Sequence, residues 1–320
     1  MTRLESLTPP IDPRRRVLLR AWGAGAAGPL VAGCAGPGAA QRAGDGALDE
    51  PGFLAPAPGT RRRVALVLSG GSARGFAHLG VLRVLEREGL RPDLVVGTSA
   101  GAIVGALYAS GLSVADIEAA AATLDWRVLF DFDPVRLLLG GNGLGILPGE
   151  GLERFLRQRL PLTIERFPMP FAAVAADMQH GEVVVLNQGD AARAVLASCA
   201  VPGLYAPVRV RGRLLADGQA VSPLPVLTAR RLGAVRVLAV DVVYPPQHGE
   251  MSSPVSMLFQ AVVISAWRLG LAERALADLV ITPDIRTAAQ LGPASRDWVT
   301  AAGERAALGA LPQIRALFEP

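Results

Sequence analysis

The chain has 320 residues, of which 51% are hydrophobic, so it is long and apolar enough to bury one sizeable core. Its formal net charge is +4, yet it contains no lysine and its arginines are mixed with acidic residues. A surface that binds nucleic acid needs a basic stripe interleaved with aromatic side chains, and this sequence has none. The composition therefore argues against a nucleic-acid partner.

Residues 1–33 are typical of an export signal. A basic start precedes a short apolar stretch, and small residues lead up to Cys34, a layout too short and too rich in glycine for a membrane-spanning helix. Residues 31–34 (VAGC) resemble a bacterial lipobox. That resemblance implies cleavage before Cys34, lipidation of its thiol, and anchoring to a bacterial membrane that faces the periplasm or the cell exterior. The alternative is an ordinary leader or a disordered arm with a chance cysteine.

One folded domain is expected after this leader. Residues 35–60 are rich in Ala, Gly and Pro without periodic apolar spacing, which predicts a flexible tether. Over residues 61–320, strands are expected at 64–68, 93–96, 171–175, 182–186, 214–216, 235–242 and 279–281, and helices at 76–88, 102–109, 151–159, 191–198, 224–232 and 256–276. This alternation predicts an α/β domain with a largely parallel sheet covered on both faces.

A glycine-rich turn, SGGSARG at residues 69–75, joins the first strand to the first helix. Successive N–H groups in such a turn can bind an anion. Neither common phosphate-binding pattern fits, because Phe76 and Ala77 stand where a P-loop has lysine and a hydroxyl residue, and Ser72 interrupts the dinucleotide pattern. We therefore interpret the turn as a set of donors for the oxyanion that forms when an ester is attacked.

The candidate nucleophile is Ser99, in the G-x-S-x-G pattern GTSAG of residues 97–101. At a sharp strand-to-helix turn, the glycines remove side chains that would clash and leave the serine hydroxyl exposed at the sheet edge. The N-terminus of the following helix directs free N–H groups toward the reacting centre. The alternative is a Gly-Ser turn that only caps a helix.

The residues alone leave the base for this serine open. The chain has three histidines, and His248 is the one that follows the candidate aspartates 177, 217 and 241, so chain order allows a Ser-Asp-His triad. The opposing hypothesis is that a buried aspartate accepts the serine proton directly. Asp217 ends a predicted strand and precedes a glycine, which fits a carboxylate facing a cleft or an ordinary Asp-Gly turn.

Four segments in order resemble the patatin-like phospholipase family, in particular its bacterial members. They are residues 69–86 (SGGSARGFAHLGVLRVLE), 95–111 (VVGTSAGAIVGALYASG), 197–208 (ASCAVPGLYAPV) and 214–226 (LLADGQAVSPLPV). The resemblance implies a three-layer α/β/α fold around a mainly parallel sheet, with Ser99 as nucleophile and Asp217 as base. It also implies no metal or cofactor, and an oxyanion hole built from Gly70, Gly71, Ser72, Ala73 and Arg74.

The expected function is a hydrolase that cleaves acyl esters of phospholipids or lysophospholipids through an acyl-enzyme, at a membrane reached through Cys34. Two residues depart from the family pattern: Ser72 stands where a third glycine is usual, and Gln219 stands where Gly or Ala is usual. A positive φ at Ser72 would be costly because the residue has a Cβ. These departures motivate another hypothesis, a catalytically silent lipid-binding lipoprotein.

Two further expectations concern apolar positions. Cys199 is expected to be a small buried residue rather than a nucleophile. Residues 137–141 (LLLGG) are expected to be core and turn, with an apolar wall or lid of the acyl cleft as the alternative.

Overall fold

The computed structural model describes residues 50–57, 59–123, 144–243, 245–248, 251–285 and 295–319, which belong to one compact unit. The predicted export signal, Cys34 and most of the predicted tether lie outside the described residues, as do residues 137–141. Among the helices that the structure describes, none is both long and apolar enough to cross a membrane.

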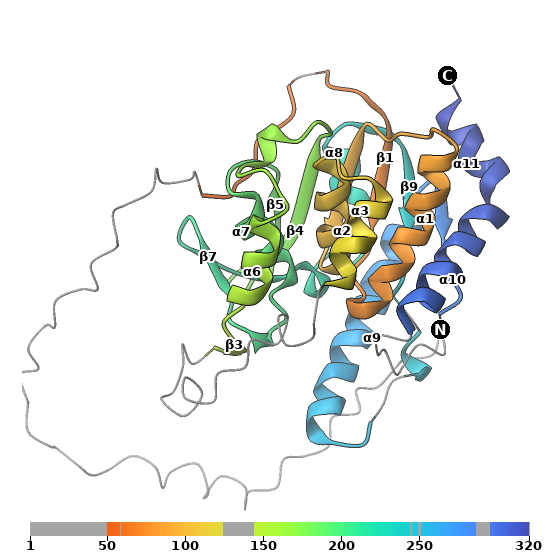
Figure 1. The fold of residues 1–320 in the computed structure, drawn as a ribbon. Coiled ribbons are helices and arrows are strands. Elements are labelled where there is room, and N and C mark those ends of the chain that lie inside the picture. Colours follow the sequence, from red (N-terminus) through yellow and green to blue (C-terminus); the bar gives the residue numbers. More distant parts are fainter. Residues whose placement is uncertain are drawn as a thin grey trace, which may run out of the picture. The chain divides into compact units, whose positions relative to one another are not determined.

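The centre of the domain is a mixed sheet that is mainly parallel, as the sequence predicts (Figure 1). The pairs from β10 through β9, β1 and β2 to β4 are parallel, whereas β4–β8, β8–β7 and β4–β5 are antiparallel. In spatial order the strands are β10 (Leu279–Ile281), β9 (Ala234–Val240), β1 (Arg62–Leu68), β2 (Leu94–Thr98), β4 (Phe171–Asp177), β8 (Arg213–Asp217) and β7 (Val208–Val210), with β5 (Val183–Leu186) beside β4.

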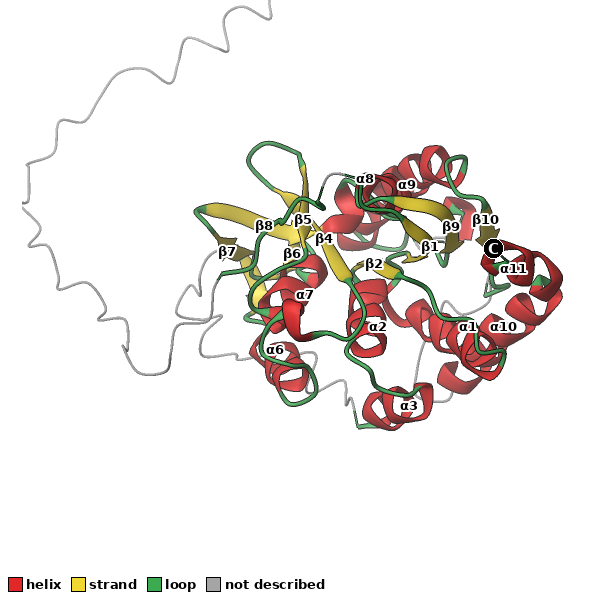
Figure 2. Ribbon diagram, turned by 90° about the horizontal axis from the view of Figure 1, so that it is seen from above, coloured by secondary structure: helices red, strands yellow, loops and turns green. Residues whose placement is uncertain are grey.

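Helices cover both faces of this sheet, which confirms the expected three layers (Figure 2). The second face carries α8 (Val226–Arg231) and α9 (Pro254–Arg274). The first face carries α1 (Phe76–Arg87), α2 (Ala100–Ala109), α3 (Val114–Ala122), α6 (Glu150–Arg157), α7 (Ala191–Cys199), α10 (Ser295–Gly309) and α11 (Leu311–Phe318).

The burial of β1 explains why its sequence is a continuous apolar run. Leu66 and Leu68 are buried in a core shared with the helices of the first face, whereas Ala65 and Val67 are buried in a second core shared with α8. Successive strand residues point to opposite faces, and a parallel sheet covered on both sides buries all of them.

Several short elements were not predicted. β3 (Gly145–Leu147) and β6 (Gly203–Tyr205) form a small separate parallel sheet. β7 joins β8 through a two-residue turn, Arg211-Gly212, whose φ angles are both positive (48° and 79°). Single 3₁₀ turns occur at η2 (Ser72–Gly75), η3 (Ile164–Arg166), η4 (Gly218–Ala220) and η5 (Pro246–His248). α3, α10 and α11 were also missed, because apolar spacing is weak in the alanine-rich α3 and α10 and because α11 has only eight residues.

The first described residues are held against the domain. Gly52 N donates to Gln188 O at 3.1 Å, and Asn187 N donates to Gly52 O at 2.8 Å. Arg211 N donates to Glu50 Oε2 at 2.7 Å. Residues 50 and 52 therefore contact the domain although they lie inside the 35–60 stretch that the composition assigns to a tether, because backbone here pairs with residues 187 and 188.

Candidate active site

Ser99 lies at the sharp turn between β2 and α2, where the G-x-S-x-G pattern places it. Its φ is 54° and its ψ is −124°, an uncommon conformation for a residue with a Cβ. The neighbouring glycines permit the turn, since a Cβ at Gly101 would lie 2.2 Å from Leu68 O and one at Gly97 would lie 2.4 Å from Gly101 O. Backbone atoms cannot yield to such contacts, so both positions require glycine.

Two consecutive side chains at the end of α7 hold the backbone of Ser99. Ser99 N donates to Ser198 Oγ at 3.0 Å, and the same hydroxyl donates to Val174 O at 2.6 Å. Cys199 Sγ donates to Ser99 O at 3.3 Å. Burial, and then the charge of Asp217, raise the pKa of the Cys199 thiol well above its usual range. Cys199 is thus a buried thiol that helps to hold the backbone of Ser99, and the expectation that it is buried is confirmed.

The side chain of Asp217 reaches Ser99 directly. Ser99 Oγ donates to Asp217 Oδ2 at 2.7 Å, across 118 positions of the chain. The strand register brings the two together, since Thr98 pairs with Val174 on β4 and the next residue of β4, Ala175, pairs with Asp217 on β8. The ends of β2 and β8 therefore lie at the same level of the sheet, one on each side of β4.

The environment of Asp217 favours proton uptake. Asp217 and Ser99 are both buried, with 3% and 7% of their surface exposed. Burial raises the pKa of the Asp217 carboxyl to about 6, although hydrogen bonds from Ser99 Oγ and Gln219 N to that carboxyl oppose the shift. Such a carboxyl is ionised at neutral pH but still has substantial affinity for a proton. Asp217 can therefore accept the proton of Ser99.

The glycine-rich turn passes beside Ser99, and only some of its N–H groups are available. Gly70 N donates to Pro223 O at 3.0 Å, and Arg74 N donates to Gly71 O at 3.1 Å. The N–H groups of Gly71, Ser72 and Ala73 form no hydrogen bond with any described residue. Of the five residues expected to form the oxyanion hole, Gly70 and Arg74 are therefore not free backbone donors, because their N–H groups already donate to Pro223 O and Gly71 O.

Both departures from the family pattern lie at this turn. Ser72 has a φ of 52°, the left-handed region that a residue with a Cβ disfavours. Gln219 lies over the start of the turn, since a Cβ at Gly70 would be 2.6 Å from Gln219 Oε1 and 3.3 Å from Ser99 Cβ. The carboxamide of Gln219 therefore approaches Ser99.

Side chains behind the turn fix its position. His78 Nε2 lies 3.0 Å from Ser69 O and carries the proton of this contact, because a carbonyl can only accept. Burial lowers the pKa of the His78 imidazole to about 4, against the opposing effect of the bond to Ser69, so the ring is neutral. Val242 N donates to Ser69 Oγ at 2.8 Å, and Arg74 Nε donates to Val242 O at 3.1 Å. His78 therefore positions the turn, and the structure describes no hydrogen bond between it and Ser99.

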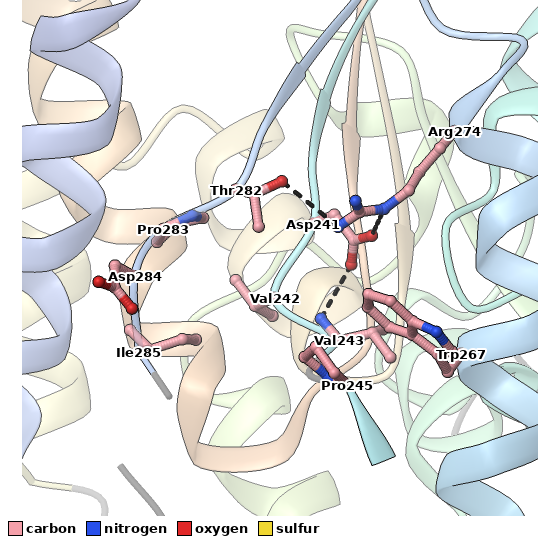
Figure 3. Close-up of a pocket in the computed structure, with 10 residues that line it drawn as sticks. All are labelled: Asp241, Val242, Val243, Pro245, Trp267, Arg274, Thr282, Pro283, Asp284 and Ile285. Atoms are coloured by element: carbon pink, nitrogen blue, oxygen red, sulfur yellow. Dashed lines mark hydrogen bonds and ion pairs between the residues drawn. The ribbon is translucent and has the colours of Figure 1, made fainter. Parts of the chain in front are cut away.

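The other candidate aspartates have partners of their own. Asp177 Oδ1 accepts from Gln179 N at 2.9 Å, closing a turn after β4. Arg274 Nε donates to Asp241 Oδ2 at 2.5 Å, and Asp241 Oδ1 accepts from Val243 N at 2.8 Å (Figure 3). The imidazole of His248 lies outside the described residues.

A cavity of about 330 Å³ lies at the carboxyl ends of β9 and β10. Neither Ser99 nor Asp217 lines it. Val242 forms part of its wall and also contacts the glycine-rich turn, because a Cβ at Gly71 would be 2.6 Å from Val242 Cγ2. Figure 3 shows the residues that line it, which are Asp241, Val242, Val243, Pro245, Trp267, Arg274, Thr282, Pro283, Asp284 and Ile285.

These features define a three-layer α/β protein with a serine at a nucleophile elbow and a buried aspartate as its hydrogen-bond partner. Residues 66–230 match the patatin-like phospholipase family. The match covers slightly more than half of the 320 residues, so the chain belongs to the patatin-like phospholipase family. The resemblance expected from the four sequence segments is thereby confirmed.

Curated relatives match more than half of the chain. An uncharacterized NTE family protein of Mycobacterium tuberculosis is 36% identical over 195 residues, which cover 58% of this chain and 53% of that protein. Lysophospholipase NTE1 of Candida albicans is 34% identical over 188 residues, which cover 56% of this chain and 13% of that protein. The chain thus spans about half the length of the mycobacterial relative and a small part of the yeast one.

A solved structure shares the fold. VipD from Legionella pneumophila superimposes with a TM-score of 0.50 at 17% identity, over 83% of this chain and 70% of that chain. This likeness supports the three-layer arrangement of the sheet and helices.

Proposed function

We propose that this chain is a serine acyl hydrolase that cleaves the acyl esters of phospholipids or lysophospholipids. The observation that carries the proposal is the 2.7 Å hydrogen bond from Ser99 Oγ to the buried Asp217 Oδ2. Membership of the family and similarity to a protein named lysophospholipase support the substrate class. Neutral acyl esters are the alternative substrates.

In the first half of the reaction, Ser99 Oγ attacks the ester carbonyl carbon while its proton passes to Asp217 Oδ2. The carbonyl oxygen becomes an oxyanion, and the N–H groups of Gly71, Ser72 and Ala73 are the free donors beside it. One such donor contributes about 3–4 kcal/mol to transition-state stabilisation in well-studied hydrolases. The tetrahedral intermediate then expels the alcohol, which takes the proton from Asp217 and leaves an acyl group on Ser99.

In the second half, Asp217 accepts a proton from a water molecule that attacks the acyl-enzyme. The second tetrahedral intermediate breaks the bond between the acyl carbon and Ser99 Oγ. The proton returns from Asp217 to Ser99, and a fatty acid leaves. The pKa of about 6 suits this cycle, because the carboxyl must gain and lose a proton near neutral pH.

A fluorophosphonate probe tests the nucleophile. It should label the wild-type protein at Ser99 and spare Ser99→Ala, and mass spectrometry should find free fatty acid released from a mixed phospholipid pool by wild type alone.

The base is tested by comparing Asp217→Asn with His248→Ala. Loss of cleavage in the first variant with retention in the second supports the dyad, and the reverse result supports a triad that ends at His248.

A second candidate function is binding of lipid without cleavage. It is favoured by the carboxamide of Gln219 over Gly70, close to where a substrate carbonyl would approach Ser99. The two functions differ in one measurement, since a silent lipid-binding protein takes up phospholipid but releases no fatty acid even at high protein concentration.

We also propose that the mature protein is anchored to a bacterial membrane through a lipidated Cys34, facing the periplasm or the cell exterior. The basic and apolar leader and the VAGC tetrapeptide support this location. The test is fractionation of cells that make wild type or Cys34→Ala, with mass spectrometry of the N-terminus. A diacylated cysteine in the wild-type membrane fraction is expected, and an unmodified, uncleaved chain would contradict it.

A further inference from the structure

The outward surface of α9 is apolar over most of its length. Large apolar side chains that are 40% or more exposed lie at positions 257, 262, 264, 269 and 271 of this helix, and Leu276 follows directly after it. At 100° per residue, these positions and the exposed alanines at 261 and 272 fall on one broad face. We call the surface that the exposed residues of 257–276 form the α9 face.

The α9 face is polar at few positions. Between residues 254 and 272, Arg268 is the single charged residue, and its side chain is exposed on the α9 face beside Ser265. A scattered exposed leucine is ordinary in a soluble domain, but a contiguous patch of this kind marks a surface for protein or membrane interaction.

The inner surface of α9 connects it to the candidate active site. Ser222 Oγ donates to Glu273 Oε1 at 2.9 Å, and Ser222 lies five residues after Asp217. Arg274 of α9 pairs with Asp241 at the carboxyl end of β9, with Trp267 beside them (Figure 3). The end of α9 is thus fixed to the same edge of the sheet at which Ser99 lies.

The rest of the helix runs outward from this edge. Arg274, which pairs with Asp241, is the last of the 21 residues of α9, and a helix of this length extends about 30 Å along its axis. Figure 1 shows α9 extending past the ends of the central strands. The apolar surface therefore projects on the side of the sheet from which a substrate would approach Ser99.

We propose that the α9 face docks on the surface of a lipid bilayer and holds the site against it. This inference rests on the proposed function, because a phospholipid ester lies at the level of the bilayer interface and its hydrolase must meet that interface. An amphipathic helix that lies in the interface buries its apolar face among the acyl chains and keeps cationic side chains near the headgroups. The apolar positions match this arrangement, and Arg268, which lies among them, can extend its guanidinium toward the headgroups, so anionic lipid strengthens the attachment.

The binding test uses full-length protein with Cys34→Ala and Ser99→Ala, so that neither a lipid anchor nor hydrolysis affects the result. An environment-sensitive fluorophore is attached at Ala261→Cys on the α9 face, or at Leu308→Cys on α10 as the control. Cys199 is buried with a raised pKa and does not compete for the label. With vesicles of phosphatidylcholine and phosphatidylglycerol, emission at position 261 should shift to the blue, and emission at position 308 should not.

The activity test compares Ile264→Glu/Leu271→Glu with Leu162→Glu/Leu308→Glu, which makes the same charge change at residues of similar exposure elsewhere. The first variant should cleave phospholipid in vesicles about tenfold more slowly or worse, because it places two carboxylates in the apolar interface. It should cleave a short-chain ester dissolved as monomers at the wild-type rate. The control variant should keep both activities.

The outcomes separate the two proposals. If wild type cleaves neither ester, the proposed function fails, and the fluorescence shift still decides whether the α9 face binds a bilayer. An unchanged emission at position 261, or equal vesicle activity in the two charge variants, overturns the docking proposal. It is also overturned if wild type is a dimer that Ile264→Glu/Leu271→Glu converts to monomers without loss of vesicle binding, since the α9 face then contacts a second copy.

Discussion

Replacing Asp217 by asparagine tests the core of the proposed chemistry in two ways at once. Asparagine has nearly the same shape, and it can still accept from Gln219 N while its amide faces Ser99. It cannot take a proton, so kcat should fall by about 10²–10⁴, the range that a positioned general base contributes. In wild type, kcat/KM should rise with pH through about 6, the pKa of the Asp217 carboxyl.

The same substitution should stabilise the fold at neutral pH. Burial raises the pKa of Asp217 from 3.8 to about 6, so the unfolded chain loses this proton at lower pH than the folded one. The contribution of Asp217 to stability is therefore present below pH 4 and lost as pH rises through 6. A shift of this size corresponds to about 3 kcal/mol in the free energy of unfolding. Asparagine avoids this loss of stability, since its side chain is neutral at every pH.

Urea unfolding of both proteins at pH 4, 5, 6, 7 and 8 measures the effect. The asparagine variant should gain stability relative to wild type between pH 4 and pH 7, and the gap should then stay constant. Other titrating groups cancel in this difference because both proteins contain them. A gap that does not change with pH would refute the buried, proton-accepting state of Asp217, and a variant with wild-type kcat would refute its role as base.

Three further changes have defined outcomes. Ser198→Ala removes the acceptor for the backbone of the nucleophile, so it should cost about 1–3 kcal/mol in urea unfolding and lower kcat, with KM little changed. Gly101→Ala places a Cβ 2.2 Å from a strand carbonyl and should cost about 3 kcal/mol or more, whereas Gly309→Ala, which has open space, should cost nothing. Glu273→Gln should be more stable than wild type at pH 8 but not at pH 4, because burial raises the pKa of Glu273 to about 7 and the unfolded carboxyl ionises first.

The central strands could be predicted because their burial leaves a direct mark on the sequence. Residues 64–68 are apolar without interruption, which is what a strand covered on both faces requires, and the strand is observed at Arg62–Leu68. The sharp turn at Ser99 was predicted for a similar reason, since glycine at 97 and 101 is needed for backbone contacts that exclude a Cβ.

The remaining features depend on tertiary contacts that no local pattern encodes. The hydroxyl of Ser198 was not singled out, although a polar side chain at the buried end of an apolar helix needs a partner, and here the partners are Ser99 N and Val174 O. Gly70 was expected as an oxyanion donor, but its N–H is taken by Pro223 O, a residue 153 positions away. The place of Gln219 over Gly70 likewise follows from the meeting of β1 and β8 loops in space.

The exposed turn at Arg211-Gly212 has a consequence for how this protein can change. It sets the alignment of β8 on β7, and β8 aligns Asp217 opposite Ala175. Because alternate residues of a strand point to opposite faces, a one-residue slip of β8 against its neighbours would turn the carboxylate into the other layer, and a two-residue slip would keep it in the same layer but move it about 7 Å along the strand, away from Ser99. The register of β8, which pairing with β4 fixes on one side and the two-residue turn to β7 fixes on the other, therefore keeps this carboxylate within reach of Ser99.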